Sequence, residues 1–142
     1  MQYIGLYREL APDQHRTYRE SIHEAIAQGA SYSVDEVASY LEAGHDLLDI
    51  MEGTSDVVGG VFSVPGGPSM MTDGEYAWRY DLSFYVRHYA PALPDAFAAR
   101  VAENGGVVPS KTFEELREAS ATVRRDLGFR KSEQFQNRRK GP

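Results

Sequence analysis

The chain has 142 residues, no cysteine and a formal net charge of -6. Its length suits one domain, and without cysteine it can form no disulfide, thiolate metal site or catalytic thiol. The sequence shows no secretory signal pattern and no apolar run near the ~18 residues of a membrane span, so we expect a cytoplasmic protein that does not enter membranes.

Helical periodicity dominates the first third of the chain. Residues 14–28 and 33–44 carry apolar side chains at helical spacing, which predicts two helices that pack as a hairpin. Gly29 is the expected C-terminal cap of the first helix, and Gly44 closes the second. The short apolar cluster at 47–51 could be a strand or a helical turn, and we favour the helical turn.

Extended structure is expected in the middle of the chain. Residues 57–64 are rich in β-branched and aromatic side chains and predict a strand. Strands at 69–72 and 75–78 should form a hairpin across Asp73-Gly74, a dipeptide that suits the positive φ angles of a type I′ turn.

Helical spacing returns from Tyr80. It predicts helices over 80–90, 94–103 and 112–127, separated by proline and glycine segments. We therefore predict an α+β fold: a predominantly helical single domain over 1–129, with a small antiparallel hairpin or sheet in its middle. Residues 130–142 are polar and basic, and we expect a flexible tail there.

The charges are distributed unevenly along the chain. The tail carries +4, so the residues before it carry -10. Ten acidic residues but only one basic residue lie between Asp35 and Asp81. Acids that merely keep a protein soluble are the plainer interpretation, but such a field also repels nucleic acid and attracts basic proteins. We therefore expect a basic protein partner and no nucleic acid.

The same stretch contains the only tryptophan and several tyrosines. Tyrosine and tryptophan on an acid-rich surface are typical of the residues that anchor a protein partner. We predict that a partner contacts acidic, aromatic and neighbouring side chains of this stretch: Asp46, Asp49, Glu52, Asp56, Asp73, Glu75, Tyr76, Trp78 and Arg79.

An alternative function class is a small metal-assisted hydrolase. His45-Asp46, with Asp49 one turn later, resembles the metal-bridging His-Asp dipeptide of the HD phosphohydrolases. The glycine pairs lack the Gly-Lys-Ser/Thr ending of a phosphate loop, and no serine lies in a nucleophile elbow. We expect no cofactor and name no catalytic residue.

A family resemblance is carried by residues 72–97. Thr72-Asp73-Gly74, Trp78-Arg79, Asp81-Leu82, Tyr85-Val86, Tyr89 and Leu93-Pro94 with Phe97 resemble a motif of small bacterial proteins from toxin-immunity neighbourhoods. Residues 93–97 followed by Asn104-Gly105-Gly106 are similar to a pattern of the SUKH immunity superfamily, where it precedes a sheet rather than a helix. The resemblance implies an immunity-type inhibitor that sequesters a toxin or another basic protein. A regulatory interaction module without a toxin stays open.

Overall fold

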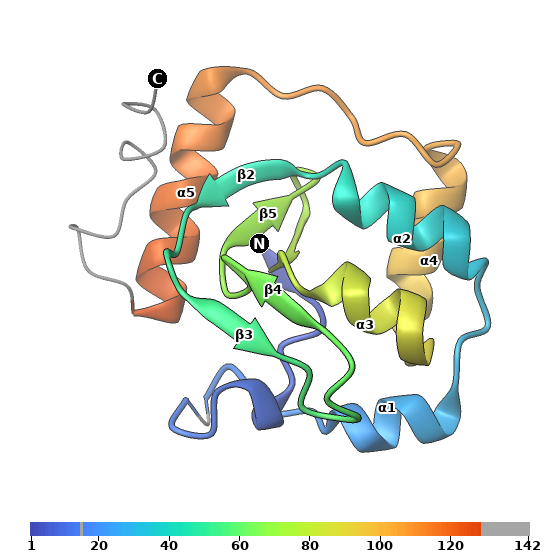
Figure 1. The fold of residues 1–142 in the computed structure, drawn as a ribbon. Coiled ribbons are helices and arrows are strands. Elements are labelled where there is room, and N and C mark those ends of the chain that lie inside the picture. Colours follow the sequence, from blue (N-terminus) through green and yellow to red (C-terminus); the bar gives the residue numbers. More distant parts are fainter. Residues whose placement is uncertain (15, 129–142) are drawn as a thin grey trace.

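Residues 1–14 and 16–128 are described by a computed structural model, shown as a ribbon in Figure 1. The α-helices are α1 (Ile22–Gln28), α2 (Val34–Glu42), α3 (Leu82–Tyr89), α4 (Asp95–Glu103) and α5 (Phe113–Leu127), and a 3-10 turn spans Arg8–Leu10. The strands are β1 (Gln2–Tyr3), β2 (His45–Leu48), β3 (Gly53–Ser55), β4 (Ser63–Pro65), β5 (Met70–Thr72) and β6 (Tyr76–Arg79).

These strands form two sheets. β1, β6, β5 and β2 lie side by side in that order in a mixed sheet, in which only β1 and β6 are parallel. β3 and β4 form a separate antiparallel pair, which we call the ribbon. Helices hold 40% of the structure and strands 17%. The chain is an α+β protein, but the prediction of a predominantly helical domain with one small hairpin is wrong.

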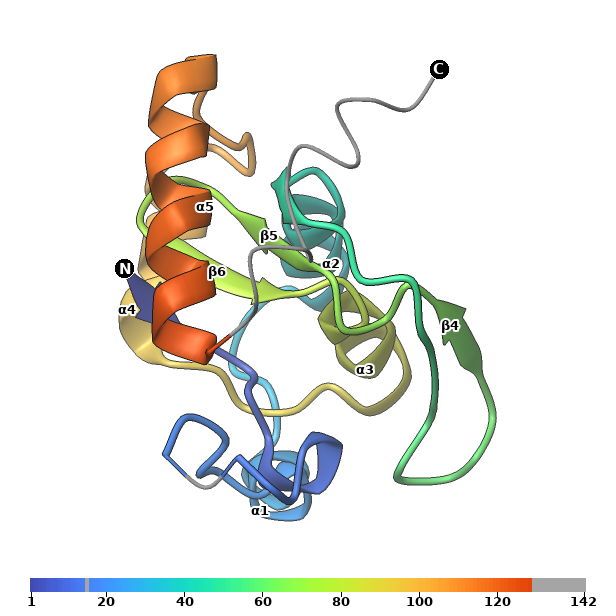
Figure 2. The same cartoon turned by 90° about the vertical axis from the view of Figure 1, so that its left-hand side faces the viewer.

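The four-stranded sheet is covered on both faces. Figure 2 shows α5 lying across one face, with α2 and α4 behind the other. The side chains of β6 alternate accordingly: Tyr76 and Trp78 join the cluster under α2, α3 and α4, whereas Ala77 joins the cluster under α5. Strands buried on both faces lose the alternation of apolar and polar residues that marks a half-exposed strand. For this reason the sequence pattern predicted fewer strands than this sheet contains.

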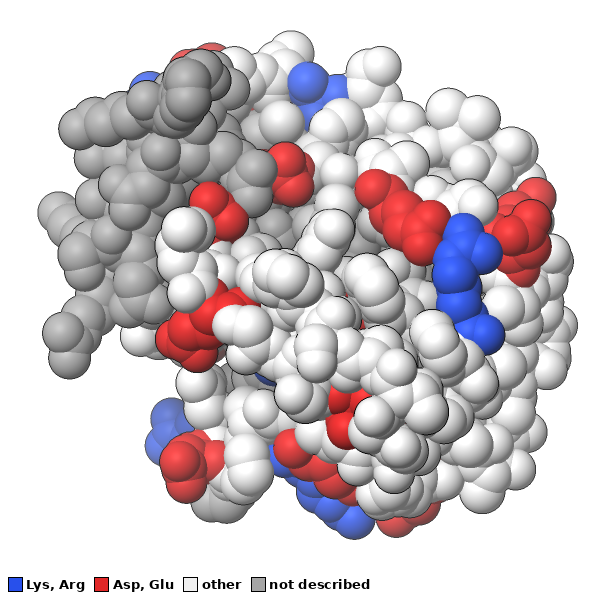
Figure 3. Space-filling view, viewed as in Figure 1, with Lys and Arg blue, Asp and Glu red and all other residues white. Residues whose placement is uncertain are grey.

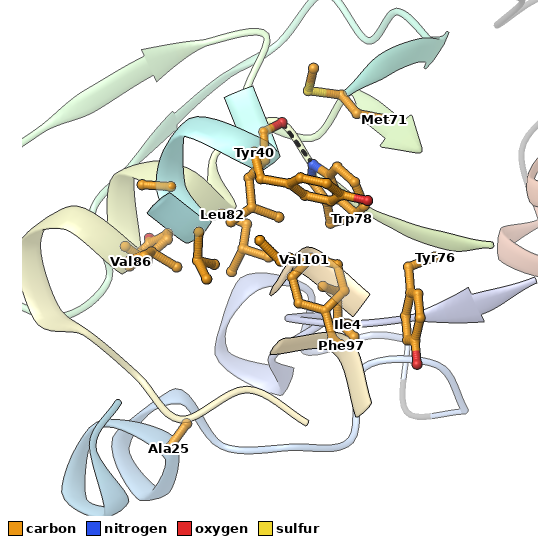
Figure 4. Close-up of a cluster of buried hydrophobic side chains, with 14 of the residues drawn as sticks. Ile4, Ala25, Tyr40, Met71, Tyr76, Trp78, Leu82, Val86, Phe97 and Val101 are labelled. Atoms are coloured by element: carbon orange, nitrogen blue, oxygen red, sulfur yellow. Dashed lines mark hydrogen bonds between the residues drawn. The ribbon is translucent and has the colours of Figure 1, made fainter. Parts of the chain in front are cut away.

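Trp78 lies at the centre of the larger cluster. Its ring is fully buried and packs against Tyr40 of α2 and Phe97 of α4, with ring centroids 6.3 and 5.7 Å away (Figure 4). The indole N–H donates to the backbone carbonyl of Leu41 at 3.2 Å, so its polar group is satisfied in the core.

Two expected elements differ from the observed ones. The cluster at 47–51 was expected to be helical, but β2 pairs with β5 at His45–Leu48 instead. Of the strand expected over 57–64, only Ser63 and Val64 are extended, as part of β4. The residues before them form a turn between β3 and β4, because the carboxylate of Asp56 accepts hydrogen bonds from the N–H groups of Val58 and Val61. In addition, α2 packs chiefly against α3 rather than forming a hairpin with α1.

The β5–β6 hairpin is present, with its turn one residue later than expected. Gly74 has a φ of 103°, but Asp73 does not adopt the positive φ that a type I′ turn on Asp73-Gly74 requires. The Asp73 carboxylate instead accepts hydrogen bonds from the N–H groups of Glu75 and Tyr76, at 2.9 and 2.8 Å. A side chain therefore closes this turn.

The later helices follow the sequence prediction closely. α4 and α5 begin and end within a residue of the expected limits, and α5 has the reciprocal capping box of Thr112 and Glu115. α3 begins at Leu82, two residues after the expected start, and ends before Pro91 as expected. The first predicted helix is shorter than expected: α1 begins at Ile22, whose N–H donates to the carboxylate of Glu9 at 2.9 Å. The predicted tail, 130–142, lies outside the described residues.

Candidate protein-binding surface

The predicted partner-binding residues divide into an interior set and a surface set. Asp56, Asp73, Tyr76, Trp78 and Arg79 are buried. Asp46, Glu52 and Glu75 are exposed and Asp49 is half-buried. The buried rings are therefore not available to a partner at the surface, and the buried charges need an explanation within the fold.

Asp73 holds the hairpin to the helices. Its Oδ2 accepts hydrogen bonds from the hydroxyl of Tyr40 and from Nε of Arg100, both at 2.7 Å. Burial alone would raise the pKa of this carboxyl, but hydrogen bonds from Tyr76, Tyr40 and Arg100 outweigh burial and lower the pKa. Asp73 is therefore a stabilising anion of the folded chain, and Arg100 also reaches Glu75 at 3.3 Å.

Arg79 and Asp81 form a buried ion pair at the start of α3. Nε and Nη2 of Arg79 donate to the two carboxylate oxygens of Asp81 at 3.0 and 2.8 Å. Oδ2 of Asp81 also accepts from the hydroxyl of Thr54 in β3 at 3.0 Å, and its N–H donates to the carbonyl of Gly67. The carboxylate of Asp81 thus joins the hairpin to the ribbon, and its backbone N–H holds the turn after β4.

Asp56 shapes the turn of the ribbon. Besides the N–H groups of Val58 and Val61, it accepts hydrogen bonds from the N–H of Gly59 and the hydroxyl of Tyr89 in α3. Burial opposes ionisation of Asp56, but these donors lower its pKa on balance. The carboxylate therefore fixes a loop and does not face a partner.

The acidic stretch is partly neutralised by arginines that follow it in the sequence. Arg87 of α3 contacts Asp35 at 3.0 Å and Glu42 at 2.8 Å, and Arg100 of α4 contacts Asp73. Since both arginines lie beyond Asp81, a count over the stretch alone overstates its charge. Only the packing of α3 and α4 reveals these pairs.

Three acids of the stretch lie along one side of the molecule. Asp46 is in β2, and Asp49 and Glu52 follow on the segment that leads into β3. Figure 3 shows acidic side chains spaced along β2 and this segment, with no comparable gathering of basic side chains beside them on the described part of that face.

Two adjoining hollows open among these acids. The larger, of about 610 Å³, is lined by residues 49–55 and 63–66. The smaller, of about 420 Å³, is lined by Glu42, Asp46 and Tyr80 among others, and both hollows include Asp49, Pro65 and Gly66. We call the two hollows together the acidic groove.

Apolar side chains are exposed at the acidic groove. Met51 is 90% exposed and Tyr80 is 40% exposed. The exposed residues of the ribbon have short side chains and leave the larger hollow open: Gly53, Ser55, Ser63 and Pro65. Tyr80, which was not among the predicted contact residues, is the aromatic residue of this segment that is exposed at the groove. It follows the last residue of β6, so it does not continue the inward alternation of Tyr76 and Trp78.

Hydrogen bonds fix the backbone that forms the floor of the acidic groove. The N–H of Ile50 donates to the hydroxyl of Ser69 at 2.9 Å, and the N–H of Tyr80 donates to the carbonyl of Ser69 at 2.7 Å. Together with the Thr54–Asp81 hydrogen bond, these contacts tie the segment around Met51 to the central sheet. A partner would meet a surface that is largely preformed.

The residues of the alternative metal site do not converge. Nε2 of His45 lies 2.8 Å from the carbonyl of Pro109, and since a carbonyl only accepts, this nitrogen carries the proton and donates. Within residues 1–14 and 16–128, no group of three or more His, Asp and Glu side chains is arranged to hold a metal ion.

No protein-family model, curated protein or solved structure matches this chain. The resemblance to immunity-type proteins therefore stays a prediction. As for membranes, α5 is the longest helix of the described chain, and neither it nor any other helix there is long and apolar enough to cross a bilayer.

Proposed function

We propose that the chain is a protein-binding module whose acidic groove sequesters a basic protein, as an immunity-type inhibitor does with a toxin. The observation that carries the proposal is the joining of carboxylates and exposed apolar side chains on one preformed surface. We place the encounter in the cytoplasm, where a chain without cysteine needs no oxidising conditions.

The two kinds of side chain have different roles in this proposal. The carboxylates of Asp46, Asp49 and Glu52 attract a basic partner over several ångströms and raise its association rate, an effect that salt weakens. Tyr80 and Met51 then lose their contact with water in the complex and slow its dissociation. The same acidic surface repels nucleic acid, so we infer a protein partner.

The test begins with the proteins encoded beside this chain. Each is expressed alone in a bacterial host, and one of them should arrest growth. Co-expression of this chain should restore growth, and the purified pair should associate faster at low salt than at high salt. If no neighbouring protein is toxic but one binds the groove, the chain is a regulatory module rather than an immunity protein.

Two variants then test the groove itself. Asp46→Asn with Asp49→Asn and Glu52→Gln should slow association by about tenfold at low salt and leave dissociation nearly unchanged. Tyr80→Ala should instead speed dissociation, with a loss of about 2 kcal/mol of binding free energy.

The matched control is Glu114→Gln with Glu118→Gln, which removes exposed acids from α5. It should leave both rate constants unchanged. Equal binding by the wild type, the triple variant and Tyr80→Ala would show that the partner binds elsewhere.

A further inference from the structure

The acidic groove adjoins β2, the strand against which α5 packs. The hydroxyl of Ser120 in α5 donates to the carbonyl of Leu47 at 3.0 Å, and Leu127, the last residue of α5, belongs to the same buried cluster as Leu47 and Leu48. Since Leu48 immediately precedes Asp49, the strand that α5 contacts leads directly into the larger hollow.

The sequence that follows α5 is complementary to the groove. Residues 129–142 carry five basic side chains and one acidic side chain, and they include Phe129 and Phe135. A groove with carboxylates and an open apolar hollow suits such a combination of cations and aromatic rings.

The length of this segment is also sufficient. Fourteen residues follow Gly128, and fourteen residues can extend over roughly 45 Å. The three-residue strands that line the larger hollow span only about 10 Å each. A short tether holds a segment near its site at an effective concentration of about 1 mM. An intrinsic dissociation constant of about 1 mM would then leave the site half occupied.

We propose that the acidic groove binds the basic C-terminal segment of the same chain, residues 129–142, when no partner is present. A basic partner must then displace this segment, so its apparent affinity falls by the fraction of molecules whose groove is already occupied. This effect on partner affinity rests on the proposed function, whereas the binding of the segment does not.

The experiment uses the full chain with Pro142→Cys, which introduces a single cysteine into a sequence that has none. A nitroxide attached there broadens the NMR signals of nearby backbone amides. At low salt, the peak intensities of the amides of Gly53, Ser63 and Gly66 should fall well below the peak intensities of the α4 amides. They should recover at about 1 M salt, where the Debye length is about 3 Å.

Two sets of substitutions make the result specific. Arg138→Gln with Arg139→Gln and Lys140→Gln changes only the segment, and it should abolish the selective broadening without affecting the fold. The groove variant Asp46→Asn, Asp49→Asn, Glu52→Gln should do the same. The control Glu114→Gln, Glu118→Gln should retain the broadening. Broadening that is uniform over the surface, or unchanged by the first two variants, overturns the proposal.

A mixed sample separates binding within one chain from exchange between copies. Isotope-labelled wild type is mixed with unlabelled protein that carries the nitroxide. Broadening at the groove in this mixture, equal to that in the single-chain experiment, would assign the groove to the segment of a second copy and overturn binding within one chain. Its absence supports the proposal.

The proposed function can fail separately. If the groove amides are broadened but the toxic neighbour binds the acid triple variant as tightly as the wild type, the segment occupies the groove and the partner binds elsewhere. If both proposals hold, Arg138→Gln with Arg139→Gln and Lys140→Gln should strengthen partner binding by several-fold.

Discussion

The β5–β6 hairpin and the β3–β4 ribbon are built alike but lie in different surroundings. Both are short antiparallel pairs of three- or four-residue strands. The hairpin is buried on both faces, so its aromatic residues form the core and its acids pair with arginines. The ribbon has one face toward water, so Glu52, which precedes it, remains at the surface, whereas Asp56 in its turn is buried. Burial, rather than residue type, decides which of the two can meet a partner.

The largest effect expected from this difference concerns the two aromatic residues at the end of the hairpin. Trp78→Ala should lower the free energy of unfolding by about 3–5 kcal/mol, because it empties the centre of the core. Tyr80→Ala, two residues later and 40% exposed, should cost less than about 1 kcal/mol. Chemical denaturation measures both. Similar losses would mean that the two rings do not differ in role.

The buried ion pair should show the next largest effect. Asp81→Ala leaves the guanidinium of Arg79 buried without its carboxylate, which should cost about 3 kcal/mol or more. Adding Arg79→Met removes the unpaired charge and should restore much of the loss. Thermal unfolding of the single and double variants checks this. No recovery in the double variant would show that the Asp81 side chain acts mainly through Thr54.

A smaller effect is expected where the ribbon meets the hairpin. A methyl group on Gly67 would lie 1.9 Å from Oγ1 of Thr54 and 3.0 Å from Oδ2 of Asp81. Gly67→Ala should therefore displace the Thr54 hydroxyl and cost about 1–3 kcal/mol. Thr54→Ala in the same chain should recover part of that stability. If Gly67→Ala is as stable as the wild type, the ribbon can shift without cost, and the groove is less preformed than its hydrogen bonds indicate.

The smallest effect concerns pH. The pKa of Asp73 is lower in the folded chain than the unfolded value of about 3.9. Its contribution to stability is therefore complete above that value and is lost as pH falls through the lower, folded pKa. Asp73→Asn should reduce the loss of stability on acidification, measured as the melting temperature between pH 5 and pH 2.

The sequence predicted the helices better than the sheet, for local reasons. Thr112 and Glu115 cap α5 through neighbouring backbone groups, and Pro94 precedes α4, so both signals lie within a few residues. β2 gave no such signal. The pairing of β2 with β5 shifts between Asp46 and Leu48, so Leu47 and Leu48 both join the cluster under α5 and the strand loses its alternation.

The candidate site shows the same difference between local sequence signals and long-range packing. The position of the acids in the sequence led us to predict that Asp46, Asp49 and Glu52 contact a partner. It could not separate them from Asp73 or Asp56, because the partners of those two carboxylates come from α2, α3, α4 and the ribbon turn. Which acids reach the surface is a property of long-range packing, and a single sequence contains no direct signal for it.

The parallel pairing of β1 with β6 sets an order for folding. Gln2 lies opposite Tyr76, and the N–H of Ile4 donates to the carbonyl of Ala77 at 3.1 Å. Strand β1 is synthesised before the hairpin, so it can find its place only after the hairpin has been made. Until then the side chain of Ile4, which is buried in the folded chain, stays exposed to water and to chaperones. A strand that precedes its partner by more than seventy residues therefore completes the sheet late.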